Sequence, residues 1–366
     1  MRWDGYRDER VTYRRVTWPG LVEGEDVGCV TGGSLELSAL SDLRSSGTAH
    51  YCSDEELDTD GLLRVYYTAT DATGESETTA LGTYFMTAGE PDFSGSTVEG
   101  ELQLQSVLKV ALKAKPGRIY TVAAGTNAVA KAVAIMGTLG LRTNEPSSSY
   151  TLSRDAVYDP DDCWLTIAND LLSRAGYASC WPDGYGVVQM DPYTEPQERE
   201  HRWDFASGEL SILEPVVTVS DNSGDTYNAC RLTYETEEES LWASAVNDDP
   251  NSESCRERTG YEVTYYEGVT ELSGGTTAER LASLKAMAQT KLADNSSEVQ
   301  YLEWGHPWVP LWPNDAIGVS YPEAGVEWSG AVTSMQISLD GHATCTTKAR
   351  RFVRKGFTAT VEGGSW

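Results

Sequence analysis

The sequence predicts a mainly β protein of the α+β class, built from two small antiparallel β-barrels with inserted α/β units. Segments in which apolar and polar side chains alternate occupy residues 1–105 and return after residue 202. Between them, and again within 237–295, apolar residues recur at helical spacing. A chain of 366 residues is also too long for one typical hydrophobic core, so several compact units are expected.

These changes of period divide the chain into five parts. We expect an N-terminal β-barrel in 1–105, an α/β domain with two helices and a hairpin in 106–201, a discontinuous second β-barrel in 202–236 and 296–355, an inserted domain with one helix in 237–295, and a C-terminal tail in 356–366. The sequence of the second barrel is thus predicted to be interrupted by the inserted domain.

In the N-terminal barrel, the segment from Val30 to Tyr51 contains the clearest pair of strands. Leu35 and Leu37 alternate with polar neighbours, as in a half-buried strand. The Ser-Ser-Gly sequence at 45–47 is typical of a turn, after which a partner strand is expected to begin. Further alternating stretches lie at 64–69 and 79–87.

Two helices and a hairpin are predicted in the α/β domain. Residues 127–139 have helical periodicity and end at Gly140, a typical C-terminal stop. The second helix follows the DPDD sequence at 159–162, in which we expect Asp159 to cap the helix rather than to bind a metal. Its apolar stripe consists of Trp164, Ile167, Ala168, Leu171, Leu172 and Ala175, before Gly176. Asp-Gly at 183–184 predicts the hairpin.

The second barrel is predicted from strands at 216–220, 231–235 and 317–321, and from a final hairpin that turns at Asp340-Gly341. The acidic segment 237–251 is expected to be a loop. Thr276 and Glu279 have the spacing of a capping box, which predicts that the helix of the inserted domain begins there.

The net charge of −28 disfavours binding to nucleic acid or to an anionic membrane, because like charges repel. Two interpretations of the charge stay open: solubility of a loop-rich protein, or an acidic channel wall to which DNA does not adhere. The seven cysteines are scattered and contain no Cys-x-x-Cys pair, which favours a reducing compartment. No apolar run approaches the length of a membrane span, so a soluble protein assembled in the cytosol is expected.

No pattern in the sequence predicts a catalytic, cofactor-binding or metal-ligating residue. The four histidines fall in separate predicted units, and no zinc-protease, nucleophile-elbow or phosphate-loop motif is present. The segment 221–225, DNSGD, departs from a calcium loop in its ligand spacing and is interpreted as a turn. His306, which precedes a proline, is interpreted as a loop or strand-end residue rather than a ligand.

Several segments, taken in order, carry a resemblance to a known family. They are VTGGSLELSALSDLRSSG at 30–47, DPY at 191–193, TYNACRLTY at 226–234, NDDPNSES at 247–254 and PNDAIGVSY at 313–321. Over residues 1–355 the chain resembles the tail hub proteins of long-tailed phages, which are related to the central baseplate hub of contractile phages. Each segment is a strand or turn signature, so the specificity lies in their order.

The resemblance implies a structural protein and not an enzyme. In that family the two barrels of one subunit are alike, so that three subunits form a ring of six similar units. The implied homotrimer links the sixfold tail tube or the distal tail ring to the tip or fibre proteins, and it allows DNA to pass on ejection without binding it specifically. Its implied partners are further copies of itself, distal tail and tube proteins, tip or fibre proteins and the tape measure protein. Its implied location is the tail tip of the virion, after assembly in the host cytoplasm.

Two alternatives remain open at this stage. Trp304, Trp308 and Trp312 resemble exposed aromatic side chains, which would suit a β-protein that binds or cleaves carbohydrate. The other alternative is a different tail-tip adaptor, such as a distal tail protein, because such proteins also use small β-barrels.

Overall fold

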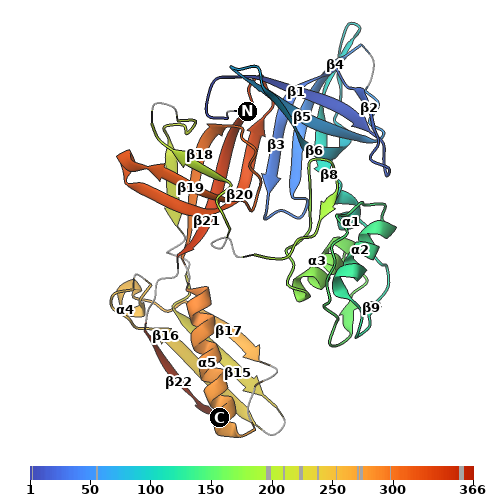
Figure 1. Ribbon diagram of the computed structural model, residues 1–366. Coiled ribbons are helices and arrows are strands. Elements are labelled where there is room, and N and C mark those ends of the chain that lie inside the picture. Colours follow the sequence, from blue (N-terminus) through green and yellow to red (C-terminus); the bar gives the residue numbers. More distant parts are fainter. Residues whose placement is uncertain are drawn as a thin grey trace. The chain divides into compact units, whose positions relative to one another are not determined.

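The computed structural model describes residues 1, 3–54, 57–194, 199–208, 211–221, 226–236, 239–252, 254–269, 272, 275–296, 298–353 and 358–366 (Figure 1). The chain divides into two compact units, which are described separately. Unit 1 comprises Met1–Val217 and Glu303–Ala349, and unit 2 comprises Thr218–Leu302 and Arg350–Trp366. The described residues form 22 strands and five α-helices, so the predicted mainly β composition is confirmed.

The N-terminal strands form one antiparallel group in the order β3-β4-β8-β6-β5-β1-β2, with β7 paired to β8. Their bounds are β1 Arg7–Val16, β2 Glu23–Asp26, β3 Val30–Ser38, β4 Ser45–Ser53, β5 Leu62–Asp71, β6 Ser76–Ala88, β7 Asp92–Ser94 and β8 Thr97–Ser106. Leu35 and Leu37 are buried as predicted. The predicted turn at 45–47 is wrong, because these residues begin β4 and the chain reverses within 39–44. There Ser38 N donates to Arg44 O at 2.7 Å, which closes the turn before the Ser-Ser-Gly sequence.

A second group of strands comes from the C-terminal half of the chain. It contains β13 Trp203–Ala206, β14 Val217–Asp221, β18 Glu298–Pro307, β19 Ala316–Tyr321, β20 Val326–Ser338 and β21 Thr344–Val353. β20 and β21 form the hairpin predicted at Asp340-Gly341. β13 runs parallel to β19, whereas β20 is antiparallel to β19.

The two strand groups are joined into a single sheet by the pairing of β20 with β3. Leu35 lies opposite Ile337 and Leu37 lies opposite Met335, and all four side chains are buried. The order therefore runs without a break from β14 to β2 through β18, β21, β20 and β3. The prediction of two separate closed barrels is not confirmed, because the strand order is open and strands of the two predicted barrels pair with each other.

Gly33 fixes the position of β3 between its two neighbours. Its φ is 137°, and a Cβ atom there would lie 2.1 Å from the Thr48 carbonyl oxygen of β4. Gly33 N donates to Asp340 Oδ1 at 2.8 Å. The Gly33 carbonyl oxygen accepts from Leu339 N at 2.8 Å. The loop that follows β20 is thus tied to β3 at a residue that only glycine suits.

The α/β domain inserted after β8 contributes most of a hydrophobic core that also includes Val16, Leu21 and Leu62 of the N-terminal segment. Its elements are α1 Lys109–Lys113, β9 Tyr120–Val122, α2 Ala128–Thr138, β10 Ala156–Tyr158, α3 Trp164–Arg174, β11 Trp181–Pro182 and β12 Val188–Gln189. Both predicted helices and the hairpin are confirmed. Asp159 does not cap α3. The cap is Cys163, whose sulfur accepts from Thr166 N, and Asp159 N instead donates to Asp162 Oδ2 at 2.8 Å in the turn before it.

Unit 2 is a four-stranded sheet in the order β17-β15-β16-β22, crossed on one face by the long helix α5 (Figure 1). Its elements are β15 Ala229–Glu235, β16 Ser240–Asn247, α4 Arg256–Thr259, β17 Thr264–Val269, α5 Thr277–Asn295 and β22 Ala359–Ser365. Leu284, Ala288 and Leu292 of α5 pack on the buried face of the sheet. The capping box is confirmed, since Glu279 N donates to Thr276 Oγ1 and Thr276 N donates to Glu279 Oε2.

Three expectations for this region differ from the structure. The strand at 231–235 belongs to unit 2 rather than to the sheet of unit 1. Within the expected loop 237–251, residues 240–247 form β16, and the expected tail contains β22, which pairs with it. The alternation of buried Leu241, Ala243 and Ala245 with less buried neighbours is a strand pattern that the surrounding acidic residues obscured. The predicted turn at 221–225 lies outside the described residues except for Asp221, the last residue of β14.

None of the helices in the described part of the chain has the length and apolar character that a membrane span requires.

We predict that Gly33→Ala will lower the free energy of unfolding by roughly 1–3 kcal/mol or more, because alanine is strained at this φ and its Cβ would overlap the β4 backbone. Urea or thermal unfolding measures the change. Gly28→Ala is the matched control, since no atom lies within 4 Å of a Cβ built there. Equal stability of the two variants would contradict the assigned role of Gly33.

Candidate functional site

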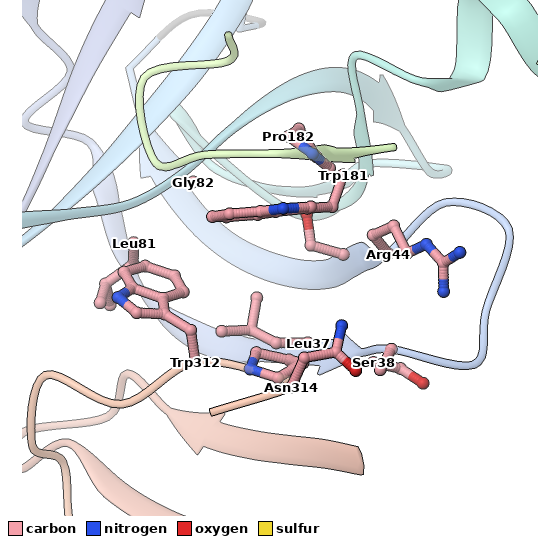
Figure 2. A pocket seen from close by; sticks show the side chains of 12 residues that line it. Leu37, Ser38, Arg44, Leu81, Gly82, Trp181, Pro182, Trp312 and Asn314 are labelled. Atoms are coloured by element: carbon pink, nitrogen blue, oxygen red, sulfur yellow. The ribbon is translucent and has the colours of Figure 1, made fainter. Parts of the chain in front are cut away.

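A small pocket lies in unit 1 where the inserted α/β domain meets both strand groups. Its volume is about 400 Å³, the open mouth included, and its walls include Leu37, Arg44, Leu81, Trp181, Pro182, Trp312 and Asn314. In Figure 2 the ring of Trp181 covers one side, Leu37 and Asn314 lie on the opposite side, and Trp312 and Arg44 lie at the two ends. The pocket therefore collects side chains from β3, the 39–44 turn, β6, β11 and the connection between β18 and β19.

Trp181 is held in place by the β11–β12 hairpin. Asp183 accepts backbone hydrogen bonds from Tyr185 N and Val187 N, both at 2.9 Å, which fix the hairpin turn. The indole Nε1 of Trp181 donates to Asp191 Oδ2 at 3.3 Å. The Asp-Gly sequence at 183–184 predicted the hairpin. It did not indicate which part of the molecule Trp181 would contact.

The hairpin is anchored to the N-terminal strands by a buried arginine. Arg64 of β5 is only 4% exposed, and its guanidinium donates to Thr83 Oγ1, Tyr185 O and Glu23 Oε2, each at 2.9 Å. Thr83 Oγ1 in turn donates to Gly184 O at 2.8 Å. A Cβ at Gly184 would lie 1.9 Å from the Ala80 carbonyl oxygen, so this close approach also requires glycine.

Arg44 is the charged group of the pocket. It stands in the turn before β4 with φ 60°, and its Nε donates to Cys180 O at 3.4 Å. Burial lowers the pKa of the Arg44 guanidinium, although an arginine stays charged under all ordinary conditions. The pocket is thus lined by two tryptophans, two prolines and one cation.

The pocket lacks the residue types that general base catalysis requires. Ser38 and Ser45 supply hydroxyl groups, but no histidine or carboxylate is among its lining residues. Elsewhere in the described residues, no group of three or more histidine, cysteine, aspartate or glutamate side chains has a geometry that could hold a metal ion.

A hydrogen-bonded chain of serine, histidine and aspartate lies on the surface of the second strand group. His201 Nδ1 is 2.7 Å from Asp204 Oδ1, and His201 Nε2 is 2.8 Å from Ser329 Oγ. Gly318 pairs with both Asp204 and Ser329, and a Cβ there would lie 2.3 Å from the Asp204 carboxylate. Sequence reasoning missed this chain because His201 and Ser329 are 128 residues apart and carry no motif.

The order of groups in this chain is that of a serine hydrolase triad, but its surroundings differ. A hydrolase also needs free N–H groups aimed at the reacting carbonyl oxygen. Ser329 lies within β20, in register with Gly318 of β19, so its backbone is part of the sheet. His201, Asp204 and Ser329 are all exposed, and none of them lines the pocket of Figure 2.

His306 is the one buried histidine among the described residues. It is 0% exposed beside the rings of Phe205 and Trp304, at centroid distances of 4.8 Å and 6.0 Å. Its Nδ1 is 2.8 Å from Pro307 O and its Nε2 is 2.7 Å from Thr347 Oγ1. Burial lowers the pKa of His306 to about 4, so the ring is neutral at pH 7, donates to the carbonyl and accepts from the threonine.

The tryptophans that suggested a carbohydrate platform are not arranged as one. Trp304 and Trp308 are fully buried, and Trp312 is half-buried at the pocket. Trp308 packs against Tyr67 and Trp3, at centroid distances of 4.9 Å and 5.6 Å. These aromatic side chains form part of the core of unit 1.

No protein-family model matches the sequence, and no curated protein matches it at the level of sequence. Solved structures do share its fold. A tail protein from Neisseria meningitidis matches with a TM-score of 0.62 and 11% identity over 94% of this chain and 97% of the other. The 43 kDa tail protein of prophage MuSo2 from Shewanella oneidensis matches with a TM-score of 0.63 and 11% identity, over 93% and 97% of the two chains.

A chain of the half-lidded PdpA–VgrG complex from Francisella also matches, with a TM-score of 0.57 and 8% identity. That match covers 94% of this chain and 58% of the other. The chain thus has the fold of tail proteins, in agreement with the family that the order of its sequence segments resembles.

We predict a pH-dependent loss of stability that comes from His306. The unfolded state binds a proton near pH 6.5 and the folded state only near pH 4, so stability is complete above about pH 6.5 and falls as the pH drops towards 4. The slope attributable to this group is at most about 1.4 kcal/mol per pH unit. Urea unfolding at a series of pH values, for the wild type and His306→Gln, measures it.

The difference between the stability–pH curves of the wild type and His306→Gln gives the contribution of His306 alone. Carboxylates that titrate in the same range contribute equally to both curves. His50→Gln is the matched control, because it makes the same substitution at an exposed side chain. A His306→Gln variant with the same pH dependence as the wild type would show that the buried ring does not contribute.

Proposed function

We propose that this chain is a structural hub of a phage tail tip. It forms a homotrimeric ring that links the sixfold tail tube or the distal tail ring to the tip or fibre proteins, and through which DNA passes on ejection. The observation that carries the proposal is the fold, which it shares with two tail proteins over at least 93% of this chain and 97% of each of theirs. Because the match covers nearly the full length of both chains, it favours a shared structural role of the whole chain over the sharing of a single domain.

The open sheet of unit 1 supports assembly as the means of function. An antiparallel sheet that does not close keeps edge strands, whose unpaired backbone groups are suited to pairing with a neighbouring chain. In the proposed ring, β2, at the end of the strand order that lies within unit 1, is an edge available to a neighbouring subunit. The proposed partners are further copies of the chain, distal tail and tube proteins, the tape measure protein and tip or fibre proteins, within the virion tail tip.

The acidic composition suits a channel through which DNA moves. With a net charge of −28, the subunit repels phosphate groups, whereas a basic wall would hold them by releasing counterions. We propose that passing DNA is not bound specifically and that the particle is assembled in the host cytoplasm before the tail tip matures.

We further propose that the chain has no catalytic activity. The specific observation that favours an enzyme instead is the contact of His201 with Asp204 and Ser329, because hydrolases use the same order of groups. Against this, Ser329 is exposed and lies within a paired strand of the sheet, whereas a hydrolase needs free N–H groups aimed at the reacting carbonyl oxygen.

We predict that a fluorophosphonate probe, which labels activated serines, will not modify Ser329 above the background of the Ser329→Ala variant. A known serine hydrolase treated in parallel shows that the probe is active. Intact-protein mass and peptide mapping measure the labelling. Stoichiometric modification of Ser329 that disappears in His201→Gln would overturn the non-enzymatic assignment.

We predict that the purified chain has a solution mass of about three times 39.9 kDa, because a hub of this kind needs three copies around an axis. Light scattering coupled to size-exclusion chromatography, over a series of concentrations, measures it. A chain that stays monomeric at every concentration, and that binds glycans on an array, would contradict the hub and favour the carbohydrate-binding alternative.

A further inference from the structure

Two of the seven cysteines lie close together at one end of the β3–β4 hairpin in unit 1. Cys52 lies in β4, and Cys29 immediately precedes β3. Cys52 N donates to Cys29 O at 2.9 Å, and the next residues along, Val30 and Tyr51, are partners in the antiparallel register. The two cysteines therefore lie next to each other at the end of the β3–β4 ladder, Cys29 in the turn that precedes β3 and Cys52 within β4.

Neighbouring positions across an antiparallel ladder satisfy the main geometric condition for a disulfide. Opposed residues of antiparallel strands have Cα atoms about 4.5–5.5 Å apart and carry their side chains on the same face of the sheet. Disulfides form across Cα distances of about 4.4–6.8 Å. The backbone hydrogen bond of 2.9 Å between the two cysteines is consistent with a Cα separation in this range.

The same pair is accessible to solvent, in contrast to most of the other cysteines. Cys52 is exposed and Cys29 is half-buried, whereas Cys180, Cys230, Cys255 and Cys345 are buried. The remaining cysteine, Cys163, caps α3 through its sulfur and has no cysteine beside it in the helix. A small oxidant can therefore reach the thiols of both Cys29 and Cys52.

The acidic side chains around Cys52 slow the oxidation of its thiol to a disulfide without preventing it. Cys52 Sγ lies 3.8 Å from Glu99 Oε1 on β8. Burial and the nearby carboxylates of Glu99 and Asp54 raise the pKa of Cys52, and the neighbouring Cys29 contributes to the same shift. Because the thiolate is the reacting form, the pair stays reduced in a reducing compartment and oxidises more readily above neutral pH.

We propose that Cys29 and Cys52 form a reversible disulfide when the protein passes from a reducing to an oxidising environment. The oxidant is a small disulfide such as oxidised glutathione. One thiolate attacks it and releases one glutathione thiolate, and the second cysteine attacks the mixed disulfide and releases the other. The protein loses two hydrogen atoms, and the small disulfide is reduced to two thiols.

The disulfide closes the β3–β4 hairpin at its open end, opposite the 39–44 turn. β3 is the strand that joins the two strand groups, so the bond restrains the segment on which the sheet depends. Only the change of environment, from the cytosol to the outside of a cell, rests on the proposed function. The chemistry depends on this chain alone.

The test uses the full chain, purified with all seven thiols reduced, and then incubated with oxidised glutathione at pH 8. We expect two thiols to become resistant to alkylation under denaturing conditions, with the loss of two hydrogen atoms and a linked peptide pair that contains Cys29 and Cys52. Dithiothreitol should reverse the change. The oxidised form should also melt at a higher temperature than the reduced form, because a cross-link restrains the unfolded chain.

Two variants separate the pair from general oxidation. Cys52→Ser should leave Cys29 carrying a glutathione adduct and no internal bond, whereas Cys163→Ser should form the bond as the wild type does. Seven alkylatable thiols after treatment, stable glutathione adducts on both cysteines, or a disulfide only between two chains would overturn the proposal. The solution mass of the reduced protein tests the homotrimeric hub without involving the disulfide. Failure of the disulfide proposal can therefore be distinguished from failure of the hub proposal.

Discussion

The pairing of β20 with β3 is the interaction on which the architecture of unit 1 depends. It joins strands that are about 300 residues apart in the sequence, and it does so with backbone hydrogen bonds and with four buried apolar side chains, Leu35, Leu37, Met335 and Ile337. A single-residue slip would turn these side chains to the opposite face. Gly33, held between the β4 backbone and Asp340, sets the register at the end of the pairing.

The inserted α/β domain is positioned on this sheet by polar groups that are themselves buried. Arg64 satisfies a carboxylate, a hydroxyl and a backbone carbonyl at once, which is the condition under which a buried charge is tolerated. Gly184 allows the hairpin backbone to approach β6. The pocket between Trp181 and Trp312 is a consequence of this docking, since its walls come from segments far apart in the chain.

Local features could be predicted from the sequence, and long-range pairing could not. The helices at α2, α3 and α5 have clear periodicity and end signals, and the Asp-Gly turns mark hairpins. The cap of α3 was misassigned, because the four residues DPDD form their own turn and leave the cap to Cys163. β16 was missed because acidic residues flank it, and β22 because it contains two consecutive glycines, a residue with weak strand preference.

The same limit applies to the candidate sites. Nothing in the sequence brings Trp181 to Trp312, His201 to Ser329, or β20 to β3, because each contact depends on the order of strands in the sheet. The proximity of Cys29 and Cys52 follows from the register of the β3–β4 hairpin, and placing the turn at 45–47 rather than 39–44 concealed it. An error of a few residues in a turn therefore hides a pair of side chains at the far end of the hairpin.

The proposed hub function requires three copies of this fold to form a ring. Electron microscopy of the purified protein tests this requirement most directly. A trimeric hub will give class averages with threefold symmetry and an open centre, of a size consistent with three copies of the chain. Particles of single-chain size, or closed particles without a threefold axis, would contradict it.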